Sequence, residues 1–170
     1  LSVLKDIGLR GNGDKYLGVV GPVRVGKSTF IKRFMEVLVI PHIKNEDDKK
    51  RALDELPQSG IGKTIMTMEP KFVPSNAVEI LVEENLTVKV RLIDCVGYII
   101  ENAQGYLEDG KMRMVKTPWF SETIPFDDAA KIGTQKVIKE HSTLGICVLS
   151  DGTINEFTRD DYKNSDEQVI

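Results

Sequence analysis

An eight-residue segment near the start of the chain has the glycine, lysine and serine spacing of a phosphate-binding loop. Residues 21–28 read GPVRVGKS and match G-x-x-x-x-G-K-[ST] at every fixed position. Gly21 and Gly26 allow backbone conformations that turn successive amide N–H groups toward one anion. We expect Lys27 to reach the β- and γ-phosphates of a nucleotide and the Ser28 hydroxyl to ligate Mg²⁺. The candidate nucleotide-binding residues are Gly21, Pro22, Val23, Arg24, Val25, Gly26, Lys27, Ser28 and Thr29.

A second segment further along the chain supplies an acid and a glycine. Residues 90–93 form an apolar run that ends at Asp94, and residues 94–97 fit D-x-x-G. We expect Asp94 to act as a Walker B acid that holds Mg²⁺ through water, and the Gly97 N–H to sense the γ-phosphate. Asp and Gly are also common where a strand simply ends at a turn, so this motif is weak alone. The phosphate-binding loop upstream favours the functional interpretation.

A threonine that orders around Mg²⁺ is expected between these two motifs. Thr64 and Thr67, within residues 62–70 (GKTIMTMEP), are the candidates. Thr67 is preferred because it lies three residues before Pro70, as in the T-x-x-P of Obg-like GTPases. The alternative is a loop threonine that only contacts solvent. The predicted catalytic set is therefore Lys27, Thr67 and Asp94, and the predicted metal ligands are Ser28, Thr67 and Asp94.

Other residues that could take part in hydrolysis give weaker signals. Tyr98 stands where Ras-like enzymes carry a water-orienting glutamine, so hydrolysis needs another water-positioning group, a potassium ion or a partner. His42 and His141 are the only histidines, and no His/Cys/Asp cluster has the spacing of metal ligands. His141 lies near a predicted helix end, where a dipole partner is favoured over a catalyst.

The elements around the phosphate-binding loop meet its structural requirement of a strand before and a helix after. Residues 16–20 form a short apolar run that predicts the strand. From Lys27 onward apolar residues fall at helical spacing until Pro41, which ends the helix. The motif alone is expected by chance in about one chain in a hundred. A chance match would not require a strand before it and a helix after it, so their presence favours a genuine phosphate-binding loop.

The rest of the chain alternates between strands, helices and loops. Residues 45–56 predict a solvated helix with ion pairs Glu46–Lys50 and Asp47–Arg51. The later predictions are a loop over 57–67, a hairpin of strands 78–82 and 86–92, a long loop over 98–125, a helix over 126–142, a buried strand over 144–149 and a helix-like stretch over 154–170.

This order predicts a three-layer α/β P-loop NTPase fold. Only about four strands are visible, whereas a complete nucleotide-switch domain of this kind normally has two more. We therefore expect a lead-in segment over residues 1–14 and, over 15–170, the front part of a P-loop NTPase domain in a longer protein.

Composition restricts the function class. The 170 residues are 41% hydrophobic and carry a net charge of 23 − 26 = −3, so no global basic field predicts a nucleic-acid partner. No apolar run approaches the roughly 18 residues that span a bilayer. Cys95 and Cys147 lie inside apolar runs, which predicts two buried, reduced thiols. A soluble intracellular domain is expected.

Together these residues resemble the stage IV sporulation protein A family of spore-forming bacteria. The resemblance covers essentially the whole chain and about the first third of the family's length. Besides the phosphate-binding loop, it is carried by segments 16–21 (YLGVVG), 54–59 (DELPQS), 62–67 (GKTIMT), 69–74 (EPKFVP), 94–98 (DCVGY), 117–119 (TPW), 124–126 (IPF), 140–143 (EHST) and 151–154 (DGTI).

The resemblance implies a translation-factor-type (TRAFAC) GTPase-like fold that hydrolyses ATP rather than GTP. Hydrolysis in the family drives self-assembly into a static polymer, the basement layer of the spore coat. The implied partners are other copies, a small amphipathic membrane-recruiting peptide and further coat proteins. The implied location is the mother-cell cytoplasm at the outer forespore membrane. Family members have two adjacent threonines before Glu-Pro, whereas Met68 takes the second place here, so a sensor role would depend on Thr67 alone.

Two alternatives stay open from the residues. One is a GTPase switch of the ribosome-assembly type, by fold analogy. Its guanine-reading [NT]KxD motif is expected beyond Ile170. The other is a structural module with a vestigial nucleotide site, which the intact Lys27, Ser28, Thr67 and Asp94 argue against.

Overall fold

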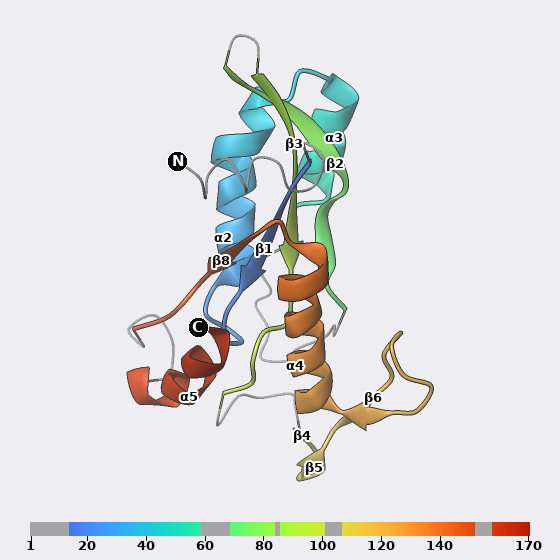
Figure 1. The fold of residues 1–170 in the computed structure, drawn as a ribbon, viewed down its shortest axis with the longest axis vertical. Helices are drawn as coiled ribbons and strands as arrows, with labels where there is room; N and C mark the ends of the chain where they lie inside the picture. Colours follow the sequence, from blue (N-terminus) through green and yellow to red (C-terminus); the bar gives the residue numbers. More distant parts are fainter. Residues whose placement is uncertain (1–13, 59–68, 84–85, 101–106, 152–157) are drawn as a thin grey trace.

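A computed structural model describes residues 14–58, 69–83, 86–100, 107–151 and 158–170 (Figure 1). The predicted lead-in segment therefore lies outside the described residues except for Asp14, which begins the first strand. Most of the loop over 57–67 and the turn of the predicted hairpin also lie outside them.

A four-stranded sheet forms the centre of the domain. Its strands are β1 (Asp14–Val20), β2 (Lys71–Glu83), β3 (Leu86–Asp94) and β8 (Leu144–Cys147), in the order β2-β3-β1-β8. β1 runs parallel to β3 and to β8, whereas β2 runs antiparallel to β3. The predicted mixed α/β class and the β2–β3 hairpin are confirmed.

Helices follow the strands as the sequence pattern predicts. The described helical segments are α2 (Lys27–Phe34) with its continuations η2 (Met35–Val39) and η3 (Ile40–His42), α3 (Glu46–Asp54), α4 (Phe126–Lys136) with its continuation η4 (Val137–His141), and α5 (Arg159–Val169). Pro41 lies in the tight turn η3 that ends the first of these, as expected for a residue without an N–H donor.

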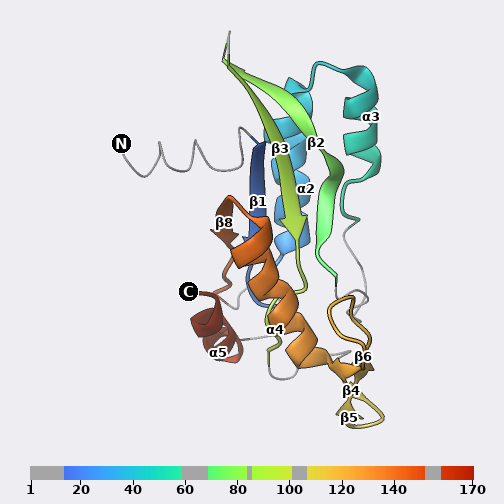
Figure 2. The ribbon, with the colours of Figure 1, turned by 45° about the vertical axis from the view of Figure 1, so that its right-hand side comes forward.

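Alternate residues of β3 face two separate cores, so the sheet is the middle of three layers (Figures 1 and 2). Leu92 packs in the larger core, which contains Ile31 and Met35 from α2 and η2. Ile93, one residue later, packs in the core that contains Val137 of η4. The three-layer arrangement is thus present around the described strands.

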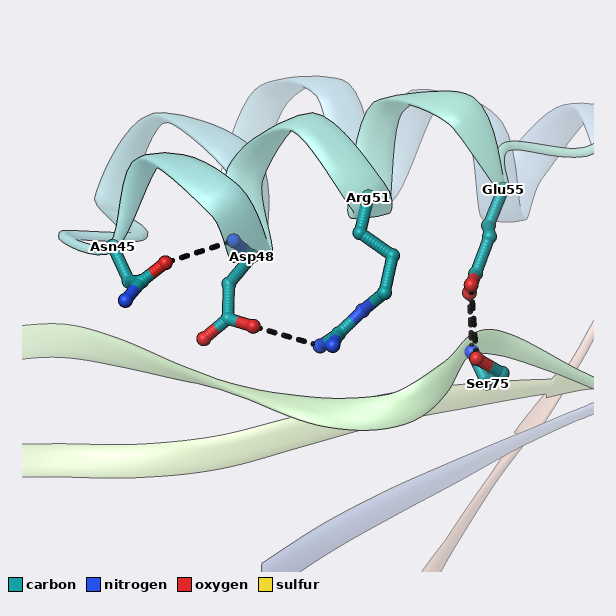
Figure 3. Close-up of polar contacts among 5 residues, drawn as sticks. All are labelled: Asn45, Asp48, Arg51, Glu55 and Ser75. Carbon is teal, nitrogen blue, oxygen red and sulfur yellow. Dashed lines mark hydrogen bonds and ion pairs between the residues drawn. The ribbon is translucent and has the colours of Figure 1, made fainter.

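The C-terminal end of helix α3 is hydrogen-bonded to β2 (Figure 3). Asn45 caps the helix start, where its Oδ1 accepts a hydrogen bond from the Asp48 N–H at 2.9 Å. The Glu55 carboxylate accepts two hydrogen bonds from Ser75, at 2.5 Å from the backbone N–H and 2.9 Å from Oγ. Ser75 lies where the β2–β3 register shifts between Val73 and Val78. Glu55 therefore satisfies an N–H on a part of β2 that the ladder leaves irregular.

The ion pairs of α3 differ from those predicted. They connect residues three apart, with Glu46–Lys49 at 3.8 Å and Asp48–Arg51 at 2.9 Å. Both spacings bring side chains together on a helix, so sequence spacing alone does not choose between them. The predicted solvated character of α3 holds except at Ala52, which is fully buried.

Three further expectations need correction. β2 is a 13-residue strand rather than a short one over 78–82, because its pairing with β3 resumes beyond a register shift between Val78 and Val73 and continues back to Lys71. Within the predicted loop over 98–125, the described residues form two short antiparallel pairs, β4 (Leu107–Glu108) with β5 (Lys111–Met112) and β6 (Met114–Val115) with β7 (Ile124–Pro125).

The third correction concerns β8, which is half-exposed instead of buried. Among the described strands it pairs only with β1, so it forms an edge of the sheet. Leu144 is 41% exposed and Cys147 is an exposed free thiol, whereas Cys95 is buried as predicted. Within the residues that the structure describes, we find no helix with the length and apolar character that crossing a bilayer requires.

Gly18→Ala should destabilise the domain by about 1–3 kcal/mol, because a Cβ at this position overpacks the contact between β1 and the end of η4. It would lie 2.0 Å from Ser142 Oγ and 3.0 Å from Val137 Cγ1. Urea unfolding followed by circular dichroism measures the effect. Gly145→Ala is the matched control, since Gly145 is the β8 partner of Gly18 and its Cβ would meet nothing within 4 Å. Equal stability of the two variants would contradict this packing.

Candidate nucleotide-binding site

The loop between β1 and α2 has the backbone conformation that its glycines predict. Gly21 and Gly26 have φ angles of 154° and 96°, and Arg24 also has a positive φ of 60°. A Cβ on Gly21 would lie 2.2 Å from the Val148 carbonyl oxygen, so no larger residue fits there. Ser28 and Thr29 follow in the first turn of α2, and the Thr29 side chain is exposed. The helix N-terminus thus adds its partial positive charge to the loop.

Two loop side chains anchor the loop by packing. Val23 and Val25 are buried in a cluster with Ile100 and with Tyr162 of α5. Neither valine side chain can contact a ligand from this position, so any contribution to nucleotide binding comes from the backbone. Both valines belong to the predicted nucleotide-binding set, and no sequence motif indicates Tyr162 as their packing partner.

Lys27 is the charged centre of the site. It is only 5% exposed, and its Nζ donates hydrogen bonds to the carbonyl oxygens of Gly21 at 3.2 Å and Pro22 at 2.5 Å. An ammonium group has three N–H donors, so these two contacts leave one for a ligand. Burial lowers the pKa of Lys27, while the charge of the nearby Asp94 acts in the opposite direction.

Ser28 and Asp94 meet at the carboxyl end of β3, as the two motifs predict. The Ser28 Oγ donates a hydrogen bond of 2.6 Å to Asp94 Oδ2. The other carboxylate oxygen, Oδ1, is buried and has no hydrogen-bond partner. Burial raises the pKa of Asp94, against the Ser28 hydrogen bond and the charges of Lys27 and Lys71, which lower it.

This pair fits a hard divalent cation. A buried carboxylate oxygen without a partner, beside a hydroxyl, offers the oxygen ligands that Mg²⁺ prefers. The described residues contain no group of three or more His, Cys, Asp or Glu side chains that could hold a metal ion. Mg²⁺ at this position would therefore take its remaining ligands from phosphate oxygens and water, as is usual for this ion.

The D-x-x-G segment lies against the phosphate-binding loop. A Cβ on Gly97 would lie 2.0 Å from the Gly21 carbonyl oxygen and 2.6 Å from Lys27 Nζ, and Gly97 itself has a φ of 90°. The Val23 N–H donates a hydrogen bond of 2.9 Å to the Tyr98 carbonyl oxygen. Gly97 therefore packs against the loop with no room for a side chain.

The Tyr98 side chain is buried, so it does not reach solvent at the position where Ras-like enzymes carry the water-orienting glutamine. It is 4% exposed, and Gln135 of α4 lies near its phenol. Burial raises the pKa of the Tyr98 phenol, against the nearby Gln135, which lowers it, and the phenol stays neutral at physiological pH. Of the two histidines, His141 makes an edge contact with the Phe72 ring, with centroids 5.9 Å apart, which is a packing role.

Cys95 is a buried residue that packs beside the site, and the motifs did not indicate this role. Its Sγ lies 3.4 Å from the Val19 carbonyl oxygen and 3.9 Å from Thr134 Oγ1 of α4. Burial raises the pKa of this thiol, so it stays protonated beneath the loop. The apolar run around Cys95 was the only sequence signal of this position. Thr64 and Thr67, the candidate sensors, lie outside the described residues.

Comparison with known proteins identifies relatives over the whole chain. The family model for "Stage IV sporulation protein A, ATPase domain" matches residues 1–170. The chain is 58% identical to stage IV sporulation protein A of Bacillus anthracis and 56% identical to that of Bacillus subtilis, in each case over 100% of this chain and 35% of the relative. It is 57% identical to the protein of the same name from Clostridioides difficile, over 99% of this chain and 34% of the relative. The chain thus spans about a third of the length of these relatives, and no solved structure matches it.

Lys27→Ala should abolish measurable ATP binding, because it removes the one buried ammonium at the loop; charge-assisted contacts of this kind contribute about 1.5–3 kcal/mol each. Titration calorimetry with ATP and Mg²⁺ measures the effect. Lys32→Ala, on the solvent side of the same helix and 4.0 Å from Glu36, is the control that should bind like the parent. Unchanged ATP affinity of Lys27→Ala would contradict the assignment of the loop.

Asp94→Asn should weaken Mg²⁺-dependent hydrolysis more than nucleotide binding. The amide preserves the shape but loses the charge that holds a divalent cation. Hydrolysis measured across a Mg²⁺ titration should show a higher Mg²⁺ requirement for the variant. Identical rates at limiting Mg²⁺ would mean that Asp94 only ends the strand.

Proposed function

The chain belongs to the stage IV sporulation protein A family, and the family's ATPase-domain model matches residues 1–170. We propose that it binds ATP with Mg²⁺ and hydrolyses the terminal phosphate at the loop of residues 21–28. The observation that carries this proposal is the meeting of Lys27, Ser28 and Asp94 at one end of the sheet. The first supplies an ammonium and the other two supply the oxygen ligands of a divalent cation.

Each proposed role corresponds to one feature of the geometry. The loop amides and Lys27 bind the β- and γ-phosphates, and Ser28 and Asp94 hold Mg²⁺. The Gly97 N–H senses the γ-phosphate from its place against Gly21. Thr67 completes the metal shell only when a γ-phosphate is present.

The proposed fold type is that of the translation-factor GTPases. Its support is the antiparallel β2 beside the parallel strands β3, β1 and β8, with the phosphate-binding loop after β1 and the D-x-x-G segment after β3. The exposed edge of β8 is consistent with a sheet that further strands complete in a longer protein.

For the whole protein we propose the activity that the family resemblance implies. ATP hydrolysis drives self-assembly of the protein into a static polymer, the basement layer of the spore coat, at the forespore surface in the mother-cell cytoplasm. Its partners are other copies of the protein, a small amphipathic peptide that recruits it to the outer forespore membrane, and other coat proteins.

Turnover by the full-length protein with ATP and GTP side by side tests the proposal. We expect ATP to be hydrolysed in preference to GTP, with a dependence on Mg²⁺. Preference for GTP would instead support a switch of the ribosome-assembly type. Absence of turnover with either nucleotide would indicate a structural module.

Thr67→Ala should leave ATP binding largely intact and lower hydrolysis, and with it any assembly that follows hydrolysis. The reason is that Lys27, Ser28 and the loop amides supply most of the affinity, whereas the threonine hydroxyl acts only in the state with a γ-phosphate. Nucleotide binding, phosphate release and sedimentable polymer are measured in parallel. Thr64→Ala is the matched control and should change these less. The opposite ranking of the two variants would place the sensor at Thr64.

A further inference from the structure

The first residue of β2, Lys71, lies directly opposite Asp94 in the antiparallel pair with β3. The next pair on the same face is Val73 with Leu92, and both of these pack in the core beneath α2. Side chains directly opposite each other share a face of the sheet, with Cβ atoms about 4.5–5.5 Å apart. The Lys71 side chain therefore begins beside Asp94, whose Oδ2 accepts the hydrogen bond from Ser28.

Lys71 is exposed, so its four-carbon stem can move its ammonium without disturbing a packed core. Its charge already acts on the site, because it is one of the two ammonium charges that lower the pKa of Asp94. The other is that of Lys27, which is buried and held by two loop carbonyl oxygens. Asp94 is thus influenced by one fixed cation from α2 and one movable cation from β2.

A bound nucleotide would add negative charge that a second cation can compensate. A triphosphate and the Asp94 carboxylate together carry more negative charge than Mg²⁺ and Lys27 neutralise. Nucleotide-hydrolysing enzymes of this class use an additional cation at the γ-phosphate, supplied by the same chain or by a partner. Tyr98 supplies neither a charge nor a free hydroxyl at the position after Gly97, because its side chain is buried against α4.

We propose that Lys71 is the second cation of the nucleotide site and that its ammonium contacts an oxygen of the γ-phosphate of ATP beside Asp94. This inference rests on the proposed function, because it needs the triphosphate at the loop of residues 21–28. It adds a residue outside the phosphate-binding, Walker B and sensor motifs. A contact with the γ-phosphate discriminates ATP from ADP, whereas the loop and Lys27 bind both.

Titration calorimetry of the full-length protein with ADP and with a non-hydrolysable ATP analogue, each with Mg²⁺, tests the proposal. Lys71→Met should lower the affinity for the analogue about tenfold, at the lower end of charge-assisted contacts because the side chain is exposed, and leave that for ADP unchanged. Lys71→Arg keeps the charge and should retain most of the discrimination. Lys71→Gln is a second neutral variant and should repeat the loss.

Lys89→Met is the matched control. Lys89 is, like Lys71, an exposed lysine directly opposite an acid (Glu79) in the same hairpin, but it lies away from the loop. It should bind both nucleotides like the parent.

Three results would overturn the proposal. They are an equal loss for ADP and the analogue, no loss for either, and a gain in analogue affinity, the last of which would mean that Lys71 competes with Mg²⁺ for Asp94. If the parent itself binds neither nucleotide, the proposed function fails first and the role of Lys71 fails with it.

Discussion

The buried ammonium of Lys27 imposes the strictest requirement on the site. Removing a charge from water costs several kcal/mol unless nearby groups compensate for it. Here the compensation comes from the carbonyl oxygens of Gly21 and Pro22 and from the charge of Asp94. Gly97 must also lack a side chain, because a Cβ there would lie 2.6 Å from Nζ. The Lys27 side chain, from the first turn of α2, thus contacts both the loop after β1 and the segment after β3.

The sheet register brings these parts to the same place. β1 and β3 are parallel, and Val19 pairs with Asp94. The loop that follows β1 and the acid that ends β3 therefore lie side by side at the carboxyl ends of these strands, which is where α/β proteins bind ligands. Gly18, one residue earlier, allows η4 to approach β1 closely, since a side chain there would meet Ser142 and Val137. The same short strand consequently positions the nucleotide loop and receives the helix on the opposite face.

The sequence predicted the parts of this arrangement that local pattern determines. The loop, the helix from Lys27 and the acid at Asp94 have fixed spacing or strong periodicity, and the structure places them together. Features that depend on a neighbour along the sheet could not be predicted in this way. The apolar residues of β8 indicate a buried strand, but Leu144 is exposed because the described sheet ends there. The extension of β2 to Lys71 depends on pairing with β3 across a register shift, which no local signal reveals.

The segment at Gly97 and Tyr98 connects the nucleotide loop with the far face of the sheet. Gly97 lies against Gly21 and Lys27, and the carbonyl oxygen of the next residue, Tyr98, accepts a hydrogen bond from the Val23 N–H. The Tyr98 side chain is buried near Gln135 of α4, on the face opposite α2. Two consecutive residues after β3 therefore contact different parts of the molecule, Gly97 the phosphate-binding loop and Tyr98 both that loop, through its backbone, and the layer of α4, through its side chain. The D-x-x-G spacing fixes the position of the first residue, whereas the second has a place that only the packing of the sheet against α4 determines.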